Sequence, residues 1–416
     1  MHTTDSGVLE GWNAEEFARV ATSIENRRHD GDTSDLRILW RDEVDGREVG
    51  SGVVEARPVE AGELIAVSMP SYQVPESGEL WRTVEAVTAA GSAWADEGHV
   101  VASQQLLLAE APVPPRRPSV TEIPTEVAGE YHLGGARFDA HTGDLVELGG
   151  RPIGGPRLEL WRAPIENDLL AFSNSYVAVE PTASRGVGAP APSWADQWRA
   201  AGIDRLQRRV VSVTPGPGSL SVVHRYAPAA SREAVVVELA WTWDGASLIL
   251  EGSAVPSKGW TGTWPRIGLH FRLPEGLSRA EWFGTGPAEN YADSNVAARV
   301  GRFASNVSDL IVDYAVPQES GLRMQLRELQ LPDIDLEIRA QRAGGDLPGF
   351  ALRAHDAHEV TGAAHPYELP ESTATHLYLD VAQHGLGSRS CGPDVRPEYQ
   401  LRPRAASWSL ALRLRE

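Results

Sequence analysis

Residues 282–329 read WFGTGPAENYADSNVAARVGRFASNVSDLIVDYAVPQESGLRMQLREL, and no other stretch of the chain combines glycines, aromatic residues and polar groups so densely. Its segment 284–287 (GTGP) predicts a sharp backbone turn after a strand, because glycine and proline favour turns over packed elements. Glu289, Asn290 and Tyr291 follow that turn consecutively. This stretch is therefore the first place to look for a functional site.

Length and charge narrow the class of protein. A chain of 416 residues has room for about two or three domains, each with its own core. Its 38 basic and 57 acidic residues leave a net charge of -19, which argues against nucleic acid and anionic membranes as partners, because both require clustered Lys and Arg. The first twenty residues lack the features of a signal peptide, and no apolar stretch approaches the roughly 20 residues that span a bilayer. The single cysteine, Cys391, cannot form an internal disulfide, so we expect a soluble cytoplasmic protein.

The hydrophobic pattern of the first part is that of antiparallel β-strands. Residues 35–41 and 50–56 flank an Asp-Gly turn at 45–46 and predict a hairpin, and residues 80–87 alternate with period two. The segment 112–119 then contains four prolines, which favour an extended linker. We place a domain boundary at this linker.

The same pattern continues beyond the linker. Residues 136–147 predict a hairpin around the turn 142–144 (TGD), and residues 235–243 lead through an Asp-Gly turn into 248–253. We therefore expect antiparallel β-structure in both parts of the chain.

One helix is predicted, over residues 194–201. Ser193 can cap its start, and Gly202 can end it in the left-handed conformation. Trp194 and Trp198, spaced i and i+4, share one face of this helix. We expect that face to pack on a sheet rather than to stack on a ligand.

The remaining motifs do not favour metal or nucleophile chemistry. Five histidines lie between residues 355 and 384, but no apolar helical pattern places them on one face and no cysteine supports a zinc set. Cys391 lies in a glycine-rich loop without the helix start that would activate a nucleophile. The chain has neither Gly-x-Gly-x-x-Gly nor a Walker motif, so nucleotide binding is disfavoured.

Two pairs of acidic residues could serve as the paired carboxylates of a glycosidase. These pairs are Glu166 with Asp168 and Glu289 with Asp293, and the sequence does not supply the separation that such a role requires. The alternative is that Glu166, Asn167 and Asp168 satisfy backbone groups in a turn. Both interpretations stay open at the level of the sequence.

Four segments resemble, in order and in spacing, the C-terminal small-chain region of glycoside hydrolase family 2 β-galactosidases. They are 161–168 (WRAPIEND), 282–291 (WFGTGPAENY), 319–323 (ESGLR) and 327–329 (REL). Upstream segments are similar to the immunoglobulin-like domain that precedes this region in those enzymes. These are 24–29 (IENRRH), the strand at Trp40, 75–81 (PESGELW) and 93–99 (AWADEGH). The resemblance covers about residue 22 to the end of the chain.

The resemblance implies a mainly β fold: an immunoglobulin-like β-sandwich followed by a large antiparallel β-supersandwich of the galactose-mutarotase-like type. It places an N-terminal extension at 1–21, the immunoglobulin-like domain at 22–111, the Pro-rich linker at 112–119 and the supersandwich domain at 120–416. Family members carry their catalytic glutamates on a central (β/α)8 barrel. The chain shows no such alternation and no Asn-Glu dipeptide of the kind that carries the acid/base glutamate. We therefore expect the last two domains of a β-galactosidase, beginning at their own methionine.

The resemblance also implies a function. The chain is expected to be a C-terminal fragment or small subunit that completes the pocket for retaining hydrolysis of terminal β-D-galactosides, with a catalytic barrel on another chain as its partner. It is expected to be inactive alone and to hold no metal, with Mg²⁺ and Na⁺ sites in the missing barrel. Alternatives are a stand-alone carbohydrate-binding module and a non-catalytic remnant of a truncated gene. Whether the chain forms a homo-oligomer stays open.

The residues that match the family motifs are candidates for lining the substrate pocket or an interface. They are Arg162, Glu166, Asn167, Asp168, Glu289, Asn290, Tyr291 and Cys391. Cys391 lies where some family members carry a tryptophan that stacks on the sugar, and a thiol offers no such flat face. The loop 173–192 falls where the family has a mobile loop near the pocket. Within the opening stretch, the glycine turn and Glu289 to Tyr291 are interpreted as a scaffold and interface element rather than a self-contained active site.

Overall fold

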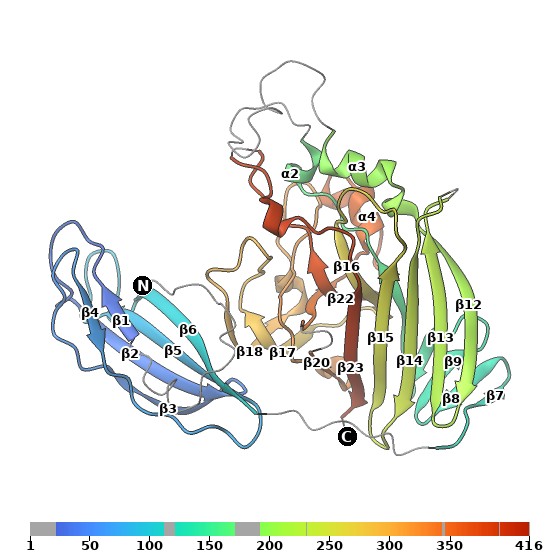
Figure 1. Ribbon diagram of the computed structural model, residues 1–416, viewed down its shortest axis with the longest axis horizontal. Coiled ribbons are helices and arrows are strands. Elements are labelled where there is room, and N and C mark those ends of the chain that lie inside the picture. Colours follow the sequence, from blue (N-terminus) through green and yellow to red (C-terminus); the bar gives the residue numbers. More distant parts are fainter. Residues whose placement is uncertain are drawn as a thin grey trace. The chain divides into compact units, whose positions relative to one another are not determined.

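The computed structural model describes residues 22–111, 121–170, 192–229, 231–342, 346–390 and 392–415 (Figure 1). The chain forms two compact units. Of the described residues, the first unit comprises 22–111 and Val300–Arg302, and the second comprises the rest. Strands dominate the described residues, which confirms the predicted mainly β fold. The predicted domain bounds stay a prediction, because the linker 112–119 lies outside the described residues.

The first unit is built from two antiparallel sheets, one with the strand order β3-β2-β5-β6 and one in which β1 pairs with β4. Its strands are β1 (Thr22–Glu25), β2 (Leu36–Val44), β3 (Arg47–Val53), β4 (Leu64–Val67), β5 (Glu79–Thr88) and β6 (Val100–Glu110). The predicted hairpin is present, and Asp45 and Gly46 turn it with positive φ angles of 48° and 71°. The predicted strand at 80–87 lies within β5, where Leu80 and Val84 are buried.

The second unit contains two large sheets. Eight strands form the first, in the order β21-β22-β16-β11-β10-β9-β8-β7. They are β7 (Thr125–Val127), β8 (Glu130–Leu133), β9 (Ala136–Asp139), β10 (Leu145–Leu148), β11 (Arg151–Glu159), β16 (Arg266–Leu273), β21 (Gly349–Arg353) and β22 (Thr375–Gln383). The predicted hairpin at 136–147 corresponds to β9 and β10.

Nine strands form the second sheet, in the order β12-β13-β14-β15-β23-β20-β19-β17-β18. They are β12 (Gln207–Gly216), β13 (Ser219–Ala227), β14 (Val235–Trp243), β15 (Leu248–Pro256), β17 (Arg279–Gly286), β18 (Arg299–Asn306), β19 (Glu328–Leu331), β20 (Leu336–Gln341) and β23 (Ala406–Leu414). Strand β17 ends at Gly286, immediately before Pro287, as the turn prediction for 284–287 requires. Figure 1 shows β12 to β15 and β23 side by side in this sheet.

The core of the second unit lies between the two sheets. Strand β14 buries alternate residues, as its period of two predicts. Its Trp241 packs on Phe138 of the other sheet, with ring centroids 5.2 Å apart. Trp408 of β23 donates from Nε1 to the backbone carbonyl of Leu379 in β22 at 3.0 Å. These contacts show two sheets packed face to face, which is the predicted supersandwich arrangement.

Three α-helices lie at one end of the second unit within the described residues (Figure 1). The predicted one is α3 (Trp194–Ala200), whose Ser193 cap accepts the Asp196 N–H at 3.0 Å and which is followed by Gly202 at φ 72°. The other two, α2 (Glu166–Leu169) and α4 (Ala357–Gly362), correct the expectation of a single helix. Both are too short to show an apolar period in the sequence.

Short 3₁₀ segments complete the described elements. They are η1 (Ile203–Arg205), η2 (Val307–Leu310), η3 (Pro332–Ile334), η4 (Pro366–Glu368) and η5 (Pro397–Tyr399).

Candidate functional site

Arg162 and Asp168 form a buried ion pair beside α2. Nη2 of Arg162 donates to both carboxylate oxygens of Asp168 at 2.9 Å, and both side chains are fully buried. Burial raises the pKa of Asp168, and the charge of Arg162 opposes that rise. Arg162 also donates to the backbone carbonyls of His384 and Gly385, the second at 3.3 Å. The pair therefore fixes the backbone that leaves the end of β22.

Asn167 holds the next part of the same backbone. Its Nδ2 donates to the carbonyls of Leu386 at 3.0 Å and Gly387 at 2.9 Å. Its Oδ1 accepts the N–H of Ser390 at 2.9 Å. We call residues 385–390 the candidate loop, because a side chain of the predicted site makes three hydrogen bonds to it.

Asp293 binds the candidate loop as well. Oδ1 accepts the Leu386 N–H at 2.9 Å, and Oδ2 accepts the Gly387 N–H at 2.8 Å. A Cβ atom at Gly385 would lie 2.6 Å from Asp293 Oδ2, so only glycine fits against this carboxylate. The sequence offered Asp293 as half of a carboxylate pair with Glu289. In the structure both of its oxygens are instead occupied by backbone donors.

Trp194 of α3 and Asp394, which follows the loop in the sequence, support the C-terminal end of the candidate loop at Arg389. Arg389 donates to the carbonyl of Leu170 at 2.7 Å and forms an ion pair with Asp394. Trp194 donates from Nε1 to Asp394 at 3.0 Å, and the Arg389 guanidinium lies 5.5 Å from the centre of its ring. Trp198 is buried in the core, as predicted for that helix face, whereas Trp194 helps to hold the loop.

Glu289, Asn290 and Tyr291 make hydrogen bonds to segment 320–324 and to their own neighbours. Glu289 Oε2 accepts the Gly321 N–H at 2.6 Å and the Tyr291 hydroxyl at 3.3 Å. Asn290 Oδ1 accepts the Met324 N–H at 3.0 Å. Burial raises the pKa of Tyr291 well above its usual value. These three residues therefore brace segment 320–324 and make no described hydrogen bond to the candidate loop.

The two other candidates stand apart. Glu166 is exposed at the start of α2, and its backbone N–H donates to Gln318 Oε1 at 3.3 Å. Cys391 lies outside the described residues, and so does 173–191 of the loop 173–192. The roles predicted for them stay predictions.

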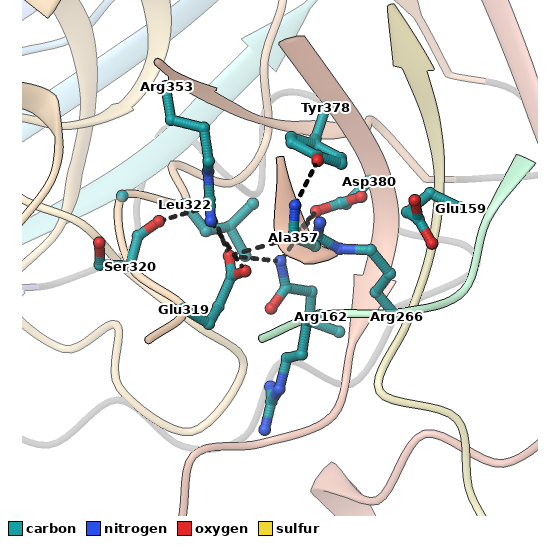
Figure 2. Close-up of polar contacts among 12 residues, drawn as sticks. Glu159, Arg162, Arg266, Glu319, Ser320, Leu322, Arg353, Ala357, Tyr378 and Asp380 are labelled. Atoms are coloured by element: carbon teal, nitrogen blue, oxygen red, sulfur yellow. Dashed lines mark hydrogen bonds and ion pairs between the residues drawn. The ribbon is translucent and has the colours of Figure 1, made fainter. Parts of the chain in front are cut away.

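A buried cluster of charges, which the sequence reasoning missed, lies in the second unit (Figure 2). Glu319 is fully buried and accepts hydrogen bonds from Arg266 at 2.9 Å and from Arg353 at 2.8 and 3.1 Å. Asp380 lies 3.3 Å from Arg266 and accepts from Gln383 at 2.8 Å. Burial alone would raise the pKa of Glu319, but Arg266 and Arg353 outweigh it and lower that pKa to about 2. We call these five residues the buried charge cluster.

The sequence carried a weak signal for this cluster. Arg266 begins β16, Arg353 ends β21 and Asp380 lies within β22, and all three side chains are buried in these largely apolar strands. Charged groups in buried strands are rare unless they are paired. Which charge pairs with which depends on the strand order, and no local pattern encodes it.

A cavity of about 550 Å³ is lined by segments that flank the candidate loop in the sequence. Its lining includes residues 380–383, which precede the loop, and 398–404, which follow it. It also includes Ala292, next to Asp293. Gln383 Oε1 is buried and has no hydrogen-bond partner among the described residues. The cavity therefore contains a lining residue that can still accept a hydrogen bond.

In the part of the chain that the structure describes, no three His, Cys, Asp or Glu side chains come together in a way that could hold a metal ion. No helix of the described residues is long and apolar enough to cross a membrane.

Two curated relatives are similar to this chain over nearly all of its length. A β-galactosidase of Arthrobacter sp. (strain B7) is 43% identical over 412 residues, which cover 97% of this chain and 40% of that relative. A β-galactosidase of Aeromonas hydrophila is 28% identical over 403 residues, which cover 92% of this chain and 37% of that relative. The chain thus spans about 40% of the length of the first of these relatives and 37% of the second.

Solved structures of other proteins also match. A galactose mutarotase related enzyme of Lactobacillus acidophilus has a TM-score of 0.34 at 8% identity and covers 71% of this chain and 98% of its own. A galactose mutarotase-like protein of Clostridium acetobutylicum has a TM-score of 0.37 at 9% identity, with 71% and 99% covered.

Family models match both units of the chain. Domain 4 of β-galactosidase matches residues 22–109. The β-galactosidase small chain matches residues 135–414, which is more than half of the sequence and includes every candidate residue that the structure describes. On the strength of that match, this chain belongs to the β-galactosidase small-chain family.

Proposed function

We propose that this chain completes the substrate pocket of a β-galactosidase whose catalytic carboxylates lie on a (β/α)8 barrel supplied by another chain. Membership of the small-chain family supports a role as a β-galactosidase component. The single observation that carries the pocket role is the candidate loop, whose backbone is held by Arg162, Asn167 and Asp293.

The way the loop is held suits it to a preorganised wall. Three side chains from two distant segments bind its carbonyl and N–H groups, so its backbone needs no ordering when substrate arrives. A catalytic pocket gains from walls that are fixed before the reaction, because reorganisation then adds nothing to the barrier. The loop's proposed task is to orient the galactoside and to exclude water.

Each described carboxylate of the candidate site is either hydrogen-bonded within the chain or exposed to solvent. Retaining hydrolysis uses two carboxyl groups about 5–5.5 Å apart, one to attack the anomeric carbon and one to protonate the leaving oxygen. Asp168 is bound by Arg162, and Glu289 accepts from Gly321 and Tyr291. Glu166 is exposed at the start of α2. This supports the proposal that both catalytic groups come from the barrel.

We propose that the barrel contacts this chain at the 550 Å³ cavity beside the loop. The side-chain oxygen Oε1 of Gln383 supports this, because it is a buried acceptor with no donor among the described residues. Such an acceptor costs free energy until a partner supplies a donor. Mg²⁺ and Na⁺ of an assembled enzyme are proposed to bind on the barrel. Among the described residues, no three His, Cys, Asp or Glu side chains come together in a way that could hold such an ion. We also propose a cytoplasmic location, in keeping with a single cysteine.

The test is an assay of the purified chain with a chromogenic β-galactoside, alone and mixed with a barrel-bearing β-galactosidase chain. We expect no turnover by the chain alone and turnover by the mixture. Matched variants Glu166→Gln and Glu289→Gln control for hidden catalysis by the chain. Turnover by the purified chain that either variant abolishes would overturn the proposal.

A further inference from the structure

A second cavity, of about 460 Å³, lies on the eight-stranded sheet and shares no lining residue with the candidate loop or its neighbouring cavity. Its volume is within the roughly 300–1,000 Å³ typical of small-molecule sites. Its polar lining includes His270, Arg272, His376, Arg157, Asp356 and Glu359. We call it the histidine pocket.

Two glycines leave room for the pocket. Gly154 and Gly155 of β11 line it at a point where the pairing of β11 with β16 shifts register. Gly155 has a φ of 111°, and a Cβ there would lie 2.8 Å from the backbone carbonyl oxygen of His270. Any larger residue at 155 would therefore strain the backbone and press on β16.

The two histidines form a hydrogen-bonded pair whose rings meet edge to edge. His270 Nε2 lies 2.9 Å from His376 Nδ1, and the ring centroids are 5.1 Å apart with an interplanar angle of 23°. The Tyr378 ring stacks on His270, with centroids 4.6 Å apart and an interplanar angle of 9°. The position of both imidazoles is therefore defined by packing and not only by one hydrogen bond.

Tyr378, which stacks on His270, also contacts the buried charge cluster. The guanidinium groups of Arg266 and Arg353 lie over the Tyr378 ring, 4.4 and 5.3 Å from its centroid. The Tyr378 hydroxyl accepts the Ala357 N–H at 3.0 Å, so it also ties the start of α4 in place (Figure 2). A site on such a rigid support can hold its polar groups in a fixed geometry.

The pair offers one donor and one acceptor to a ligand. Burial lowers the pKa of His270 to about 3, and burial also lowers the pKa of His376, so both rings are neutral near pH 7. A neutral imidazole has one N–H and one lone pair. Their mutual bond uses one nitrogen of each ring. His270 Nδ1 and His376 Nε2, which have no partner among the described residues, then present one N–H and one acceptor.

Charges of both signs surround the pair. Arg272 donates to Thr373 Oγ1 at 3.0 Å, and Arg157 lies 3.5 Å from Asp144 with 61% of its side chain exposed. Asp356 accepts two N–H groups at the start of α4, and the Glu359 carboxylate accepts the Asp356 N–H at 2.8 Å. The cationic and anionic groups are interspersed, so the pocket has no strong preference for either sign of charge.

We propose that the histidine pocket binds a neutral sugar of one or two rings. A hydroxyl group both donates and accepts, and neighbouring hydroxyls match closely spaced donors and acceptors of the kind that line this pocket. The carboxylates of Asp356 and Glu359 offset the attraction of Arg157 and Arg272 for a phosphate or other anion. A metal ion is disfavoured because the described residues contain no suitable group of three ligands. This site is separate from the proposed pocket of the β-galactosidase and does not depend on it.

The experiment is an NMR titration of the intact chain labelled at its 12 histidines. D-galactose, D-glucose and lactose are added up to about 50 mM, well above the roughly 1 mM Kd of a weak polar ligand, and inorganic phosphate is added in a parallel series. We expect a sugar to shift the ring signals of His270 and His376 and phosphate to leave them unchanged. Absence of any sugar-induced shift in these signals would overturn the proposal, and so would a shift by phosphate alone.

Variants locate the binding. Arg272→Gln and His376→Gln should each weaken sugar binding roughly tenfold, the effect of one lost strong hydrogen bond. Arg151→Gln is the matched control, because Arg151 lies on β11 outside the pocket and pairs with Asp335 at 2.8 Å. It should leave the Kd unchanged. An unchanged Kd in both pocket variants would place the sugar elsewhere and sink the proposal. Since the chain is tested alone, failure of the β-galactosidase assay would not alter these results.

Discussion

Asp293 accepts the backbone N–H of Gly387 at 2.8 Å, although the two residues are 94 positions apart in the sequence. Its other carboxylate oxygen accepts the Leu386 N–H at 2.9 Å. Hydrogen bonds to an ionised acceptor are roughly twice as strong as neutral ones. The residue thus links the segment that follows the Gly-Thr-Gly-Pro turn to the candidate loop.

Removal of the Asp293 carboxylate should loosen the candidate loop. We expect Asp293→Ala to speed amide hydrogen exchange at Leu386 and Gly387 by roughly 10- to 100-fold, since each charge-assisted bond contributes about 1.5–3 kcal/mol. Asp293→Asn keeps one acceptor and should fall between Asp293→Ala and the unchanged chain. The control Asp309→Asn alters an exposed aspartate with local partners only and should have no effect there. Equal exchange rates in all four proteins would contradict this view of the loop.

Loss of the Glu319 charge should destabilise the second unit strongly. Glu319→Gln leaves Arg266 and Arg353 buried without their shared anion. Breaking a buried pair in this way typically costs about 3–5 kcal/mol of unfolding free energy. Denaturant unfolding followed by tryptophan fluorescence would measure it. Glu281→Gln removes an exposed partner of Arg279 and should cost less than about 1 kcal/mol. If Glu319→Gln also costs less than about 1 kcal/mol, the buried charge cluster does not stabilise the second unit.

Much of the fold could be predicted because its signals are local. The Asp45-Gly46 turn, the strand at 235–243 and the Ser193 cap each follow from neighbouring residues, and the structure confirms all three. The short helix α4 was missed, although Asp356 and Glu359 form a capping box at its start. A helix of six residues leaves too little sequence for an apolar period to appear.

The candidate site was predictable only in part, because its pairings are long-range. Arg162, Asn167 and Asp168 were singled out, and the structure brings them together around the candidate loop. Arg162 and Asn167 bind backbone groups more than 200 positions away, which no spacing rule identifies. Glu319 likewise meets Arg266 and Arg353 only because three segments converge.

Mild acid should weaken the second unit through His270. Its pKa falls from 6.5 to about 3 on folding, mainly because of burial. The unfolded chain therefore binds more protons than the folded chain between these pH values, and stability is lost as the pH falls below about 6.5. At about 1.4 kcal/mol per pH unit, the loss from pH 6.5 to 5 is roughly 2 kcal/mol. His376 and His384, whose pKa values are also lowered by burial, add to it.

A variant isolates the contribution of His270. His270→Gln should give a flatter dependence of the unfolding free energy on pH between 5 and 6.5 than the unchanged chain. The measured quantity is the slope of the unfolding free energy against pH, so a loss of stability that is the same at every pH does not affect it. His141→Gln changes an exposed histidine and should keep the original slope. If His270→Gln keeps that slope as well, protonation of this ring is not linked to unfolding.

Asn167 offers the sharpest chemical test of how the candidate loop is held. Its Nδ2 donates to two carbonyls, at Leu386 and Gly387, while its Oδ1 accepts from Ser390. Asn167→Asp has nearly the same shape, but it replaces the donor Nδ2 with a carboxylate oxygen that faces the carbonyl oxygens of Leu386 and Gly387. It should therefore disturb the loop more than Asn167→Ala, which only deletes the contacts. Hydrogen exchange of residues 385–390 should speed more in Asn167→Asp than in Asn167→Ala. Lowering the pH should bring the Asp variant closer to the unchanged chain, because a protonated carboxyl regains one donor. If the Ala variant proves the more disturbed at neutral pH, the side chain supports the loop by packing rather than by its amide hydrogen bonds.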